Sequence, residues 1–411
     1  MWTPIVLVSL IALTSNLVQG QPADVPLDPI ASRILREALA DGIDLAPFNF
    51  TAPALQEIVA WAHFDAEKSD IPADLLRPAR NATTVDVHAH HVPNWFRTIE
   101  PSDGGMPSPV WTLESQLQHM ANQSIGRSIL SIPKPNIFLG DKNATVAIAR
   151  LLNENTAALV KVLPNRFSFF ATSALPYVNE SLAEVKRAVE TLGAVGVALT
   201  SNHEGEYLGN PQFARFFAGM EEMKAIVFVH PANPLMETAG RPCVGKSNRV
   251  PSGESQFIIL QPWHRFNACR HTKGIAEFFF ETARTFMDLA LSRTLQNLTH
   301  LNWIIPHVGG SLPSIIDRSI REDTAAIMEA FHTRCWWDSA GITYAHQLGG
   351  LLAYNISPSF LLYGSDWPWI PAPLVDPAFD TIATSPFLDD AQKQAMRSEN
   401  VKRLFEGKIE F

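Results

Sequence analysis

The sequence predicts an α/β protein whose main part is a (β/α)8 barrel, or TIM barrel. From residue 83 onward, short runs rich in β-branched and aromatic residues alternate with longer amphipathic stretches, as in parallel strands joined by helices. Eight such runs fall within about 300 residues, which suits this barrel with some insertion. Histidines and aspartates follow several runs, at the strand ends where such barrels carry functional residues. An open, doubly wound sheet is the alternative.

The N-terminal segment has the features of a secretory signal peptide. Residues 1–20 contain an apolar run that is too short to span a bilayer and is followed by small and polar residues. We expect cleavage after Gly20; a membrane anchor or a buried helix is the alternative. Seven Asn-x-Ser/Thr sequons agree with a secreted or lumenal glycoprotein of a eukaryote, at Asn49, Asn81, Asn122, Asn143, Asn179, Asn297 and Asn355.

Residues 21–82 are predicted to form an N-terminal helical arm that packs on the barrel. Helical patterns cover Ile30–Ala40 and Ala54–Glu67, and Pro53 opens the second pattern, where the first turn of a helix tolerates proline. No residue of this stretch has a pattern typical of catalysis.

Composition and charge exclude several classes of protein. The formal charge is −9 and no basic run occurs, which argues against nucleic acid or an anionic membrane surface as a partner. The three cysteines are too few for a disulfide scaffold. Cys243 and Cys269 could pair within one Pro/Gly-rich segment, with Cys335 buried in a strand; three free thiols are the alternative.

The barrel is expected over residues 83–411. Its eight strands are expected at Val85–His88, Ser128–Ile132, Phe167–Thr172, Val195–Thr200, Ile226–His230, Asn302–His307, Cys335–Asp338 and Phe360–Tyr363. Helices are expected between them at Leu113–Asn122, Thr145–Leu163, Ser181–Leu192, Gln212–Met223, Ile275–Leu295 and Ile315–Phe331. A long insertion, at about 233–273, follows the fifth strand at the catalytic face, where a lid or specificity element and an insertion without a role are both open interpretations.

Residues that can bind metal or carry protons lie at the carboxyl ends of the predicted strands. Residues two apart on a strand face the same side, so His88 and His90 can present two imidazoles to one point. Catalytic zinc takes about three protein ligands and keeps one position open, so further ligands come from elsewhere. The candidates at the other strand ends are His230, His307, Asp338 and Asp366.

His88, His90, His230 and Asp366 form the predicted metal site. Three imidazoles and one carboxylate suit one divalent ion; zinc is expected first, and the same ligands also admit manganese or iron. His307 could be a fifth ligand, or a free acid or base beside the ion, because histidine titrates near neutral pH. Such an ion could polarise a substrate oxygen or activate a water, so lyase and hydrolase chemistry both remain open.

Other polar and aromatic residues have weaker support. The remaining histidines are predicted to lie in loops or at the surface, or beside helices in contact with solvent: His63, His91, His119, His203, His264, His271, His300, His332 and His346. Of these, His91 and His264 remain outside candidates for the site. Trp95, Phe96, Trp367 and Trp369 could line the pocket of an aromatic substrate, with core packing as the alternative. Lys134 could bind a second carboxylate or a phenolate, with a solvated lysine as the alternative.

Six motifs occur in order: Val85-Asp86-Val87-His88-Ala89-His90, Trp111-Thr112-Leu113-Glu114, Ser128-Ile129-Leu130-Ser131-Ile132, Phe228-Val229-His230-Pro231, Ile305-Pro306-His307-Val308-Gly309-Gly310 and Gly364-Ser365-Asp366-Trp367-Pro368. Over roughly residues 84–410 the chain thereby resembles the amidohydrolase-related group typified by α-amino-β-carboxymuconate-ε-semialdehyde decarboxylase. The resemblance is strongest to the fungal branch of this group, which includes 6-methylsalicylate decarboxylase.

This resemblance implies a barrel that holds one divalent metal, with His88, His90, His230 and Asp366 in the ligand positions. It places His307 where the family keeps a catalytic histidine. The implied activity is non-oxidative decarboxylation of a small aromatic acid, a 2-hydroxybenzoate. Asp366 is the implied proton donor, with His307 tuning or relaying the proton, and a water at the metal is the other candidate donor.

Some features depart from the similar enzymes or leave alternatives open. The signal peptide and the long insertion are absent from the intracellular decarboxylases, which bears on the substrate more than on the metal. Homodimers are common among similar enzymes, although no interface can be read from the residues. A metal-dependent hydrolase of an amide, ester or lactone is the alternative enzyme, and a metal-containing binding glycoprotein is the alternative outside catalysis.

Overall fold

The computed structural model describes most of the chain from Leu27 to Phe411. The described ranges are 27–79, 81–100, 108–132, 137–234, 276–341, 345–370 and 385–411, together with the backbone of two short strands, β8 (Glu237–Thr238) and β9 (Arg241–Pro242). The predicted signal peptide, Lys134, Cys243, Cys269 and most of the predicted insertion lie outside the described residues.

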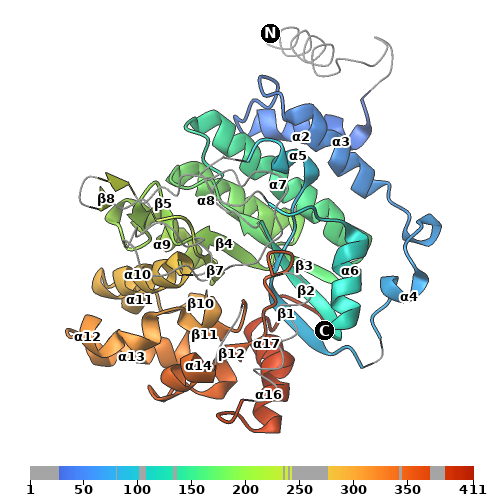
Figure 1. The fold of residues 1–411 in the computed structure, drawn as a ribbon. Helices are drawn as coiled ribbons and strands as arrows, with labels where there is room; N and C mark the ends of the chain where they lie inside the picture. The colour runs from blue at the N-terminus through green and yellow to red at the C-terminus, as the bar shows by residue number, and fades with distance from the viewer. Residues whose placement is uncertain are drawn as a thin grey trace.

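Eight parallel strands form the barrel, in the order in which they occur along the chain (Figure 1). They are β1 (Thr84–His90), β2 (Ile125–Ser131), β3 (Phe167–Thr172), β4 (Gly196–Thr200), β7 (Ile226–His230), β10 (Asn302–Ile305), β11 (Cys335–Asp338) and β12 (Leu361–Leu362). The residues after β12 close the barrel on β1: the Val87 amide donates to the Tyr363 carbonyl at 3.0 Å. The predicted (β/α)8 barrel is confirmed.

The inside of the barrel is filled by apolar side chains from all eight strands. They form one cluster with the C-terminal helix α17 (Glu399–Leu404), which supplies Val401 and Leu404 next to Phe405. The strand members are Val85, Val87, Ile129, Phe170, Ala198, Ile226, Phe228, Ile304, Trp336 and Leu362. Because apolar side chains fill the barrel, its polar site lies at one end.

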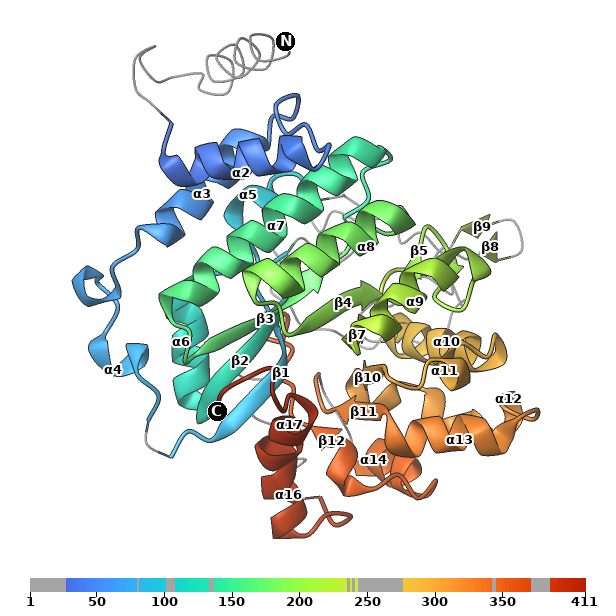
Figure 2. The ribbon, with the colours of Figure 1, turned by 180° about the vertical axis from the view of Figure 1, so that it is seen from behind.

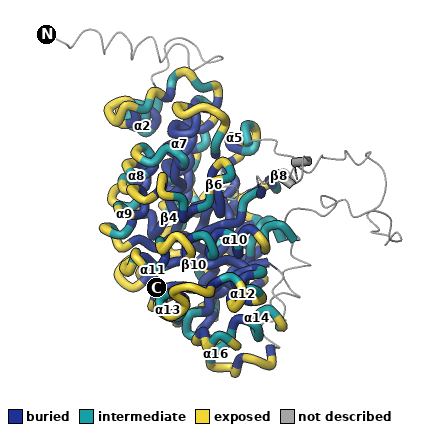
Figure 3. The backbone as a smooth tube through the Cα atoms, turned by 90° about the vertical axis from the view of Figure 1, so that its left-hand side faces the viewer, coloured by how far each residue is buried: buried dark blue, intermediate teal, exposed yellow. Residues whose placement is uncertain are grey.

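Helices cover the outside of the barrel (Figure 1, Figure 2). They are α5 (Asn94–Arg97), α6 (Leu113–Asn122), α7 (Lys142–Val162), α8 (Val178–Arg187), η2 (Ala188–Leu192), η3 (Pro211–Phe213), α9 (Ala214–Glu222), α10 (Glu277–Leu291), α11 (Thr294–Asn297), η5 (Leu312–Ser314), α12 (Ile316–Ser319), α13 (Thr324–Thr333), α14 (Ala345–Leu352), η6 (Pro358–Phe360) and α16 (Asp390–Arg397). The short turn η4 (His307–Gly309) instead lies at the carboxyl end of β10. In Figure 3 the strands are buried, while exposed residues concentrate on the outer helices and loops.

Two predicted helices are shorter than the sequence pattern suggests. The pattern at Ile315–Phe331 is split into α12 and α13, because Asp323 has a φ of 54° that no α-helix accommodates. The pattern at Ile275–Leu295 is split into α10 and α11 at Arg293, whose φ is 65°. Apolar periodicity continued across both breaks because the chain on either side still packs on the barrel.

The N-terminal arm consists of α2 (Pro29–Ala40), α3 (Thr51–Ala62), η1 (Ala66–Lys68) and α4 (Ala73–Leu76). Helices α2 and α3 lie over α7 (Figure 2) and share an apolar cluster with it, including Ile34, Ile58 and Ile148. Arg33 of α2 also pairs with Glu154 of α7 at 3.0 Å. The arm therefore covers the outer face of α7.

A helix that spans a membrane needs about 20 consecutive, mostly apolar residues. Within the ranges given above, no helix is both long enough and apolar enough to cross a bilayer.

Candidate metal centre

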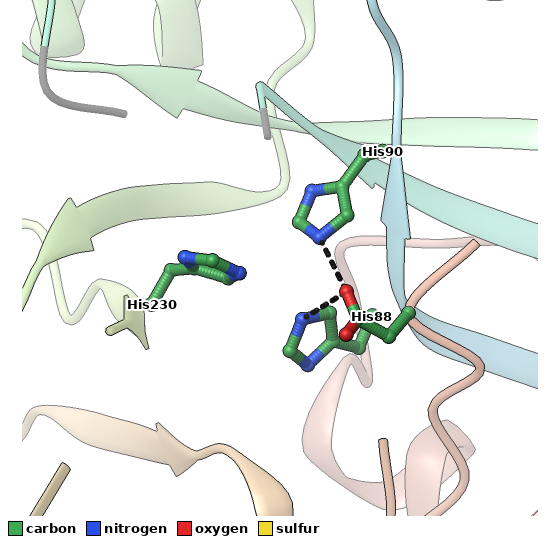
Figure 4. Close-up of side chains that lie close together, drawn as sticks. His88, His90 and His230 are labelled. Atoms are coloured by element: carbon green, nitrogen blue, oxygen red, sulfur yellow. Dashed lines mark hydrogen bonds and ion pairs between the residues drawn. The ribbon is translucent and has the colours of Figure 1, made fainter. Parts of the chain in front are cut away.

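Four side chains from three parts of the barrel meet at the carboxyl ends of the strands. One ligand atom from each lies within 4.8 Å of the others: His88, His90, His230 and Asp366. Figure 4 shows the three imidazoles turned toward a common point. The structure therefore brings together all four of the predicted metal ligands.

A β-bulge in β1 turns His88 and His90 toward this point. Val85 and Val87 face the barrel interior, so in a regular strand both histidines would face the outer helices. The pairing of β1 with β2 contains one extra residue between Asp86 and Ala89. This bulge reverses the alternation, and the His88 ring packs inside the barrel against Phe228, with ring centroids 4.8 Å apart.

The carboxylate of Asp366 lies between the imidazoles. Its Oδ1 is 3.1 Å from His90 Nε2 and 3.5 Å from His88 Nε2. The centroid of the His230 ring lies 5.3 Å from that of His88 and 5.0 Å from that of His90. The Asp366 backbone is fixed by its amide, which donates to the His88 carbonyl at 2.7 Å.

In each of the three histidines, Nδ1 is engaged away from the centre. His230 Nδ1 lies 2.9 Å from the Pro231 carbonyl and therefore donates to it. His90 Nδ1 lies 3.0 Å from the Ser131 hydroxyl, and His88 Nδ1 lies 3.0 Å from Asp338 Oδ2. Each Nε2 lone pair is thereby left for an ion.

The donor set fits a divalent cation. His88 Nε2 is buried and has no hydrogen-bond partner among the described residues, which leaves a costly unsatisfied acceptor unless an ion occupies the centre. Imidazole nitrogens with one carboxylate suit borderline ions such as zinc, and also manganese.

Two buried aspartates support the centre. Asp338, at the end of β11, accepts from the His307 and Ala340 amides at 3.0 and 2.9 Å as well as facing His88. Asp86 accepts the Ser365 hydroxyl at 2.6 Å and thereby ties β1 to the segment that carries Asp366. Asp338 was among the candidates predicted at the strand ends, but without a role. Its partner His88 lies too far along the chain for any spacing rule to link the two.

Burial and mutual repulsion keep two imidazoles neutral. Burial is the main cause that lowers the pKa of His90, and the pKa of His230 lies well below its ordinary value, since the neighbouring imidazoles add to the effect of burial. Burial also opposes charge on His88, but Asp338 outweighs it and raises the pKa of His88. Neutral imidazoles are the form that binds metal.

Burial acts to raise the pKa of both Asp366 and Asp86, but it decides the outcome only for Asp86. It would raise the pKa of Asp366, but the nearby His307 and His90 outweigh it and hold this pKa well below its ordinary value. For Asp86, burial dominates and raises the pKa to about 6, against the hydrogen bonds from Ser365. Asp366 is therefore a carboxylate and not a ready acid when the site is at rest.

His307 lies beside the four ligands rather than among them. Its Nε2 is 3.9 Å from Asp366 Oδ2, and its ring centroid is 5.2 Å from that of His88. The ring stacks on Phe279, with centroids 5.4 Å apart, while Phe278 lies 6.2 Å from the His230 ring. Neither phenylalanine was predicted to lie at the site. The run of three phenylalanines at the start of a predicted helix could have indicated an aromatic wall there.

Several of the weaker predictions are corrected by the structure. His119 and His203 are buried and not solvated or at the surface, whereas His91 lies in the loop after β1, as predicted, but is buried. His119 stacks on Trp367, with centroids 4.4 Å apart, because α6 packs against the segment that follows β12. His63, His300 and His346 are exposed as predicted, His332 is half-buried, and His264 and His271 lie outside the described residues.

The aromatic residues after β1 do not surround the metal centre. Trp95 and Phe96 of α5 are buried in the cluster shared by α7 and the N-terminal arm. Trp367 and Trp369 are half-buried beside Asp366. Of the four predicted pocket residues, only the second pair lies near the centre.

Comparison with known proteins gives consistent relatives. Residues 85–407 match the family described as amidohydrolase. A 6-methylsalicylic acid decarboxylase of Aspergillus aculeatus is 30% identical over 307 residues, which are 70% of this chain and 84% of that protein. A γ-resorcylate decarboxylase of Rhizobium sp. is 24% identical over 336 residues, covering 75% of this chain and 94% of that protein.

Solved structures share the fold. A protein named amidohydrolase II is 26% identical, with a TM-score of 0.67 over 78% of this chain and 99% of that chain. A dihydroxybenzoic acid decarboxylase of Polaromonas sp., solved with bound manganese and the inhibitor 2-nitroresorcinol, is 19% identical, with a TM-score of 0.61 over 80% of this chain and 99% of that chain. By the match over residues 85–407, the chain belongs to the amidohydrolase family.

Proposed function

We propose that this chain is a metal-dependent carboxy-lyase that releases carbon dioxide from a 2-hydroxybenzoate of the 6-methylsalicylate type. The observation that carries the proposal is the convergence of His88, His90, His230 and Asp366 with their Nε2 and carboxylate atoms free to hold an ion. Relatives named as decarboxylases of 6-methylsalicylic acid and γ-resorcylate support this reaction rather than hydrolysis.

The four ligands would hold one divalent ion, and we propose zinc, with manganese as the alternative. When bound, such an ion supplies Lewis acidity and a template for the adjacent phenolate and carboxylate oxygens of the substrate. The residues fix its place: Asp338, Ser131 and the Pro231 carbonyl hold the three imidazoles in orientation.

Asp366 and His307 are placed to move the proton that the reaction needs. Because the pKa of Asp366 is held low, its carboxylate can accept the proton that the substrate 2-hydroxyl loses on binding. Asp366 then returns this proton to the ring carbon that bears the carboxylate. The bond between that carbon and the carboxylate breaks, its electron pair restores the aromatic ring, carbon dioxide leaves, and the remaining phenolate takes a proton from the surroundings. His307, at 3.9 Å, exchanges protons between Asp366 and the surroundings.

The test couples metal analysis to product analysis. Purified protein is analysed for bound metal and then incubated with a panel of 2-hydroxybenzoates, with and without chelator, while released carbon dioxide is measured. We expect about one ion per chain and release that chelator abolishes. Asp366→Asn removes the acid and is expected to abolish release. A bound ion with hydrolysis of an amide, ester or lactone and no carbon dioxide would overturn the proposal in favour of a hydrolase.

We further propose that the protein enters the secretory route and carries N-linked glycans. The asparagines of all seven sequons are exposed. Of the nine other asparagines in the described ranges, two are exposed; the rest are half-buried Asn210, Asn233 and Asn302 and buried Asn153, Asn155, Asn202 and Asn400. The sequons therefore occur where the folded surface can accommodate a glycan, although Pro358 after the Asn355 sequon makes that site a poor acceptor.

Secretion of the full chain from a eukaryotic host tests this proposal. We expect a product that begins near Gln21 and loses mass when N-glycans are removed enzymatically. Asn143→Gln should remove the mass of one glycan, whereas Asn94→Gln, which is exposed but outside any sequon, should leave the glycan mass unchanged. A secreted mass equal to that of the bare chain would contradict the proposal.

A further inference from the structure

The turn that follows β10 has a positive φ at four consecutive residues, two of which are not glycine. His307, Val308, Gly309 and Gly310 have φ values of 56°, 52°, 82° and 59°. Positive φ is uncommon for any residue other than glycine, and for a β-branched residue such as Val308 it is an outlier. Such a backbone persists only where its surroundings hold it.

One side chain bonds both ends of this turn. Gln347, on α14, donates its amide to the His307 carbonyl at 2.5 Å and to the Gly310 carbonyl at 3.0 Å. Both partners are carbonyl oxygens, which only accept, so the NH2 group of Gln347 must face the turn. The Gly310 amide closes the turn from inside by donating to the His307 carbonyl at 2.9 Å.

Neighbouring groups leave little room for the turn to shift. A Cβ on Gly310 would lie 2.4 Å from the Phe279 carbonyl, and the Phe279 ring stacks on the His307 ring. On the other side, a Cβ on Gly341 would lie 3.1 Å from His307 Cδ2. The imidazole thus occupies a narrow slot, and its direction toward Asp366 depends on the backbone that Gln347 holds.

We propose that Gln347 is a positioning residue that holds the His307 imidazole in place beside the Asp366 carboxylate. It does not touch the metal ligands; it acts by fixing the left-handed backbone of His307 so that Nε2 stays near the Asp366 carboxylate. The inference rests on the proposed function for its kinetic consequence, but the structural consequence stands independently of it.

Three substitutions separate donor loss from other effects. Gln347→Leu removes both hydrogen bonds, and Gln347→Glu keeps the shape but brings a carboxylate against two carbonyl oxygens. Both should lower kcat by about 10- to 100-fold, the effect expected of a small displacement of a reacting group, with KM and metal content unchanged. Gln347→Lys restores N–H donors and should recover most of kcat. Gln118→Leu, an exposed glutamine on α6, is the matched control and should leave kcat unchanged.

Crystal structures of the wild type and of Gln347→Leu give a readout that does not depend on activity. We expect the separation of His307 Nε2 and Asp366 Oδ2 to grow in the variant. An unchanged separation, or equal loss of kcat in Gln347→Leu and Gln347→Lys, would overturn the inference. If the metal-bound wild type releases no carbon dioxide, the proposed function fails, and the two crystal structures still decide the role of Gln347.

Discussion

Asp338 illustrates how a single buried charge organises the centre. Its side chain is fully buried, yet both oxygens are used: Oδ2 faces His88 Nδ1, and Oδ1 accepts from the His307 and Ala340 amides. A buried carboxylate is costly unless it is paired and hydrogen-bonded. Its pairing with His88 outweighs burial and lowers the pKa of Asp338, so the residue stays ionised and holds His88 in the tautomer that frees Nε2.

Replacing Asp338 by asparagine should therefore weaken metal binding. The amide keeps the size of the side chain but removes the charge that fixes the His88 tautomer. We expect metal affinity to fall about 10- to 100-fold, the usual effect of losing a group that orients a ligand. Competition with a graded chelator measures this. Asp390→Asn is the control, because Asp390 is an exposed aspartate of α16 that pairs with Lys393. Equal metal affinity in the two variants would contradict the role of Asp338.

Buried His203 is expected to make the free energy of unfolding depend on pH. Burial lowers its pKa to about 3, whereas an unfolded histidine titrates near 6.5. The unfolded chain therefore binds the extra proton below pH 6.5, so stability falls as the pH falls through that value toward 3. Between pH 7 and pH 5 this single group should account for about 2 kcal/mol of the lost free energy of unfolding.

Urea unfolding of wild type and His203→Gln at pH 7 and pH 5 measures this contribution. The variant has no titrating imidazole at this position, so its loss of stability between the two pH values should be smaller by that amount. His346→Gln, at an exposed position, is the control and should lose as much stability between the two pH values as the wild type. Identical losses in wild type and His203→Gln would show that the folded protein protonates His203 as readily as the unfolded chain does, and would contradict the prediction.

The sequence patterns predicted where the strands begin and end better than they predicted irregularities within a strand. Ile226–His230 and Cys335–Asp338 have the predicted bounds, because continuous apolar runs end at a polar residue. The β-bulge in β1 could not be predicted: alternation indicated that His88 and His90 share a side, but not that this side is the one occupied by Val85 and Val87. A bulge is set by pairing with β2, which a local pattern does not contain.

Helix α7 is more deeply buried than a helix on the outside of a barrel would be without the N-terminal arm. Fifteen of the 21 residues of this helix are buried, and they include polar residues such as Asn153 and Glu154. Glu154 is paired by Arg33 and Arg187, and Asn153 bonds the Thr172 carbonyl. The arm thus contributes to the core although it lies outside the barrel.

Truncating one arm residue should therefore reduce stability without affecting chemistry. Ile58 of α3 is 1% exposed and packs in the cluster shared with α7. Ile58→Ala should lower the free energy of unfolding by about 2–5 kcal/mol, the usual cost of such a cavity. Metal content and kcat at low temperature should match the wild type. Val59→Ala, a half-buried neighbour, should cost less; equal costs would mean that α3 is not packed through Ile58.

At the scale of the whole molecule, the proposed ion would join distant parts of the chain. His88 and His90 come from the first strand, His230 from the fifth, and Asp366 from the segment after the eighth. Their order at strand ends was predictable, since parallel strands of a barrel share one carboxyl end. Which other groups orient them was not, because Asp338 and Ser131 lie far in sequence from the histidines that they contact.

Removing the metal should consequently destabilise the whole barrel. An ion that binds only the folded state stabilises it by about 4 kcal/mol when free metal exceeds Kd 1,000-fold. We expect chelation to lower the melting temperature of the wild type, and re-addition of zinc or manganese to restore it, because the four ligands then bridge β1, β7 and the segment after β12. His230→Gln, which removes one ligand, should melt at the same temperature with and without chelator. If the wild type loses its metal without any change in melting temperature, the ion does not bridge these strands, and the four side chains do not form its site.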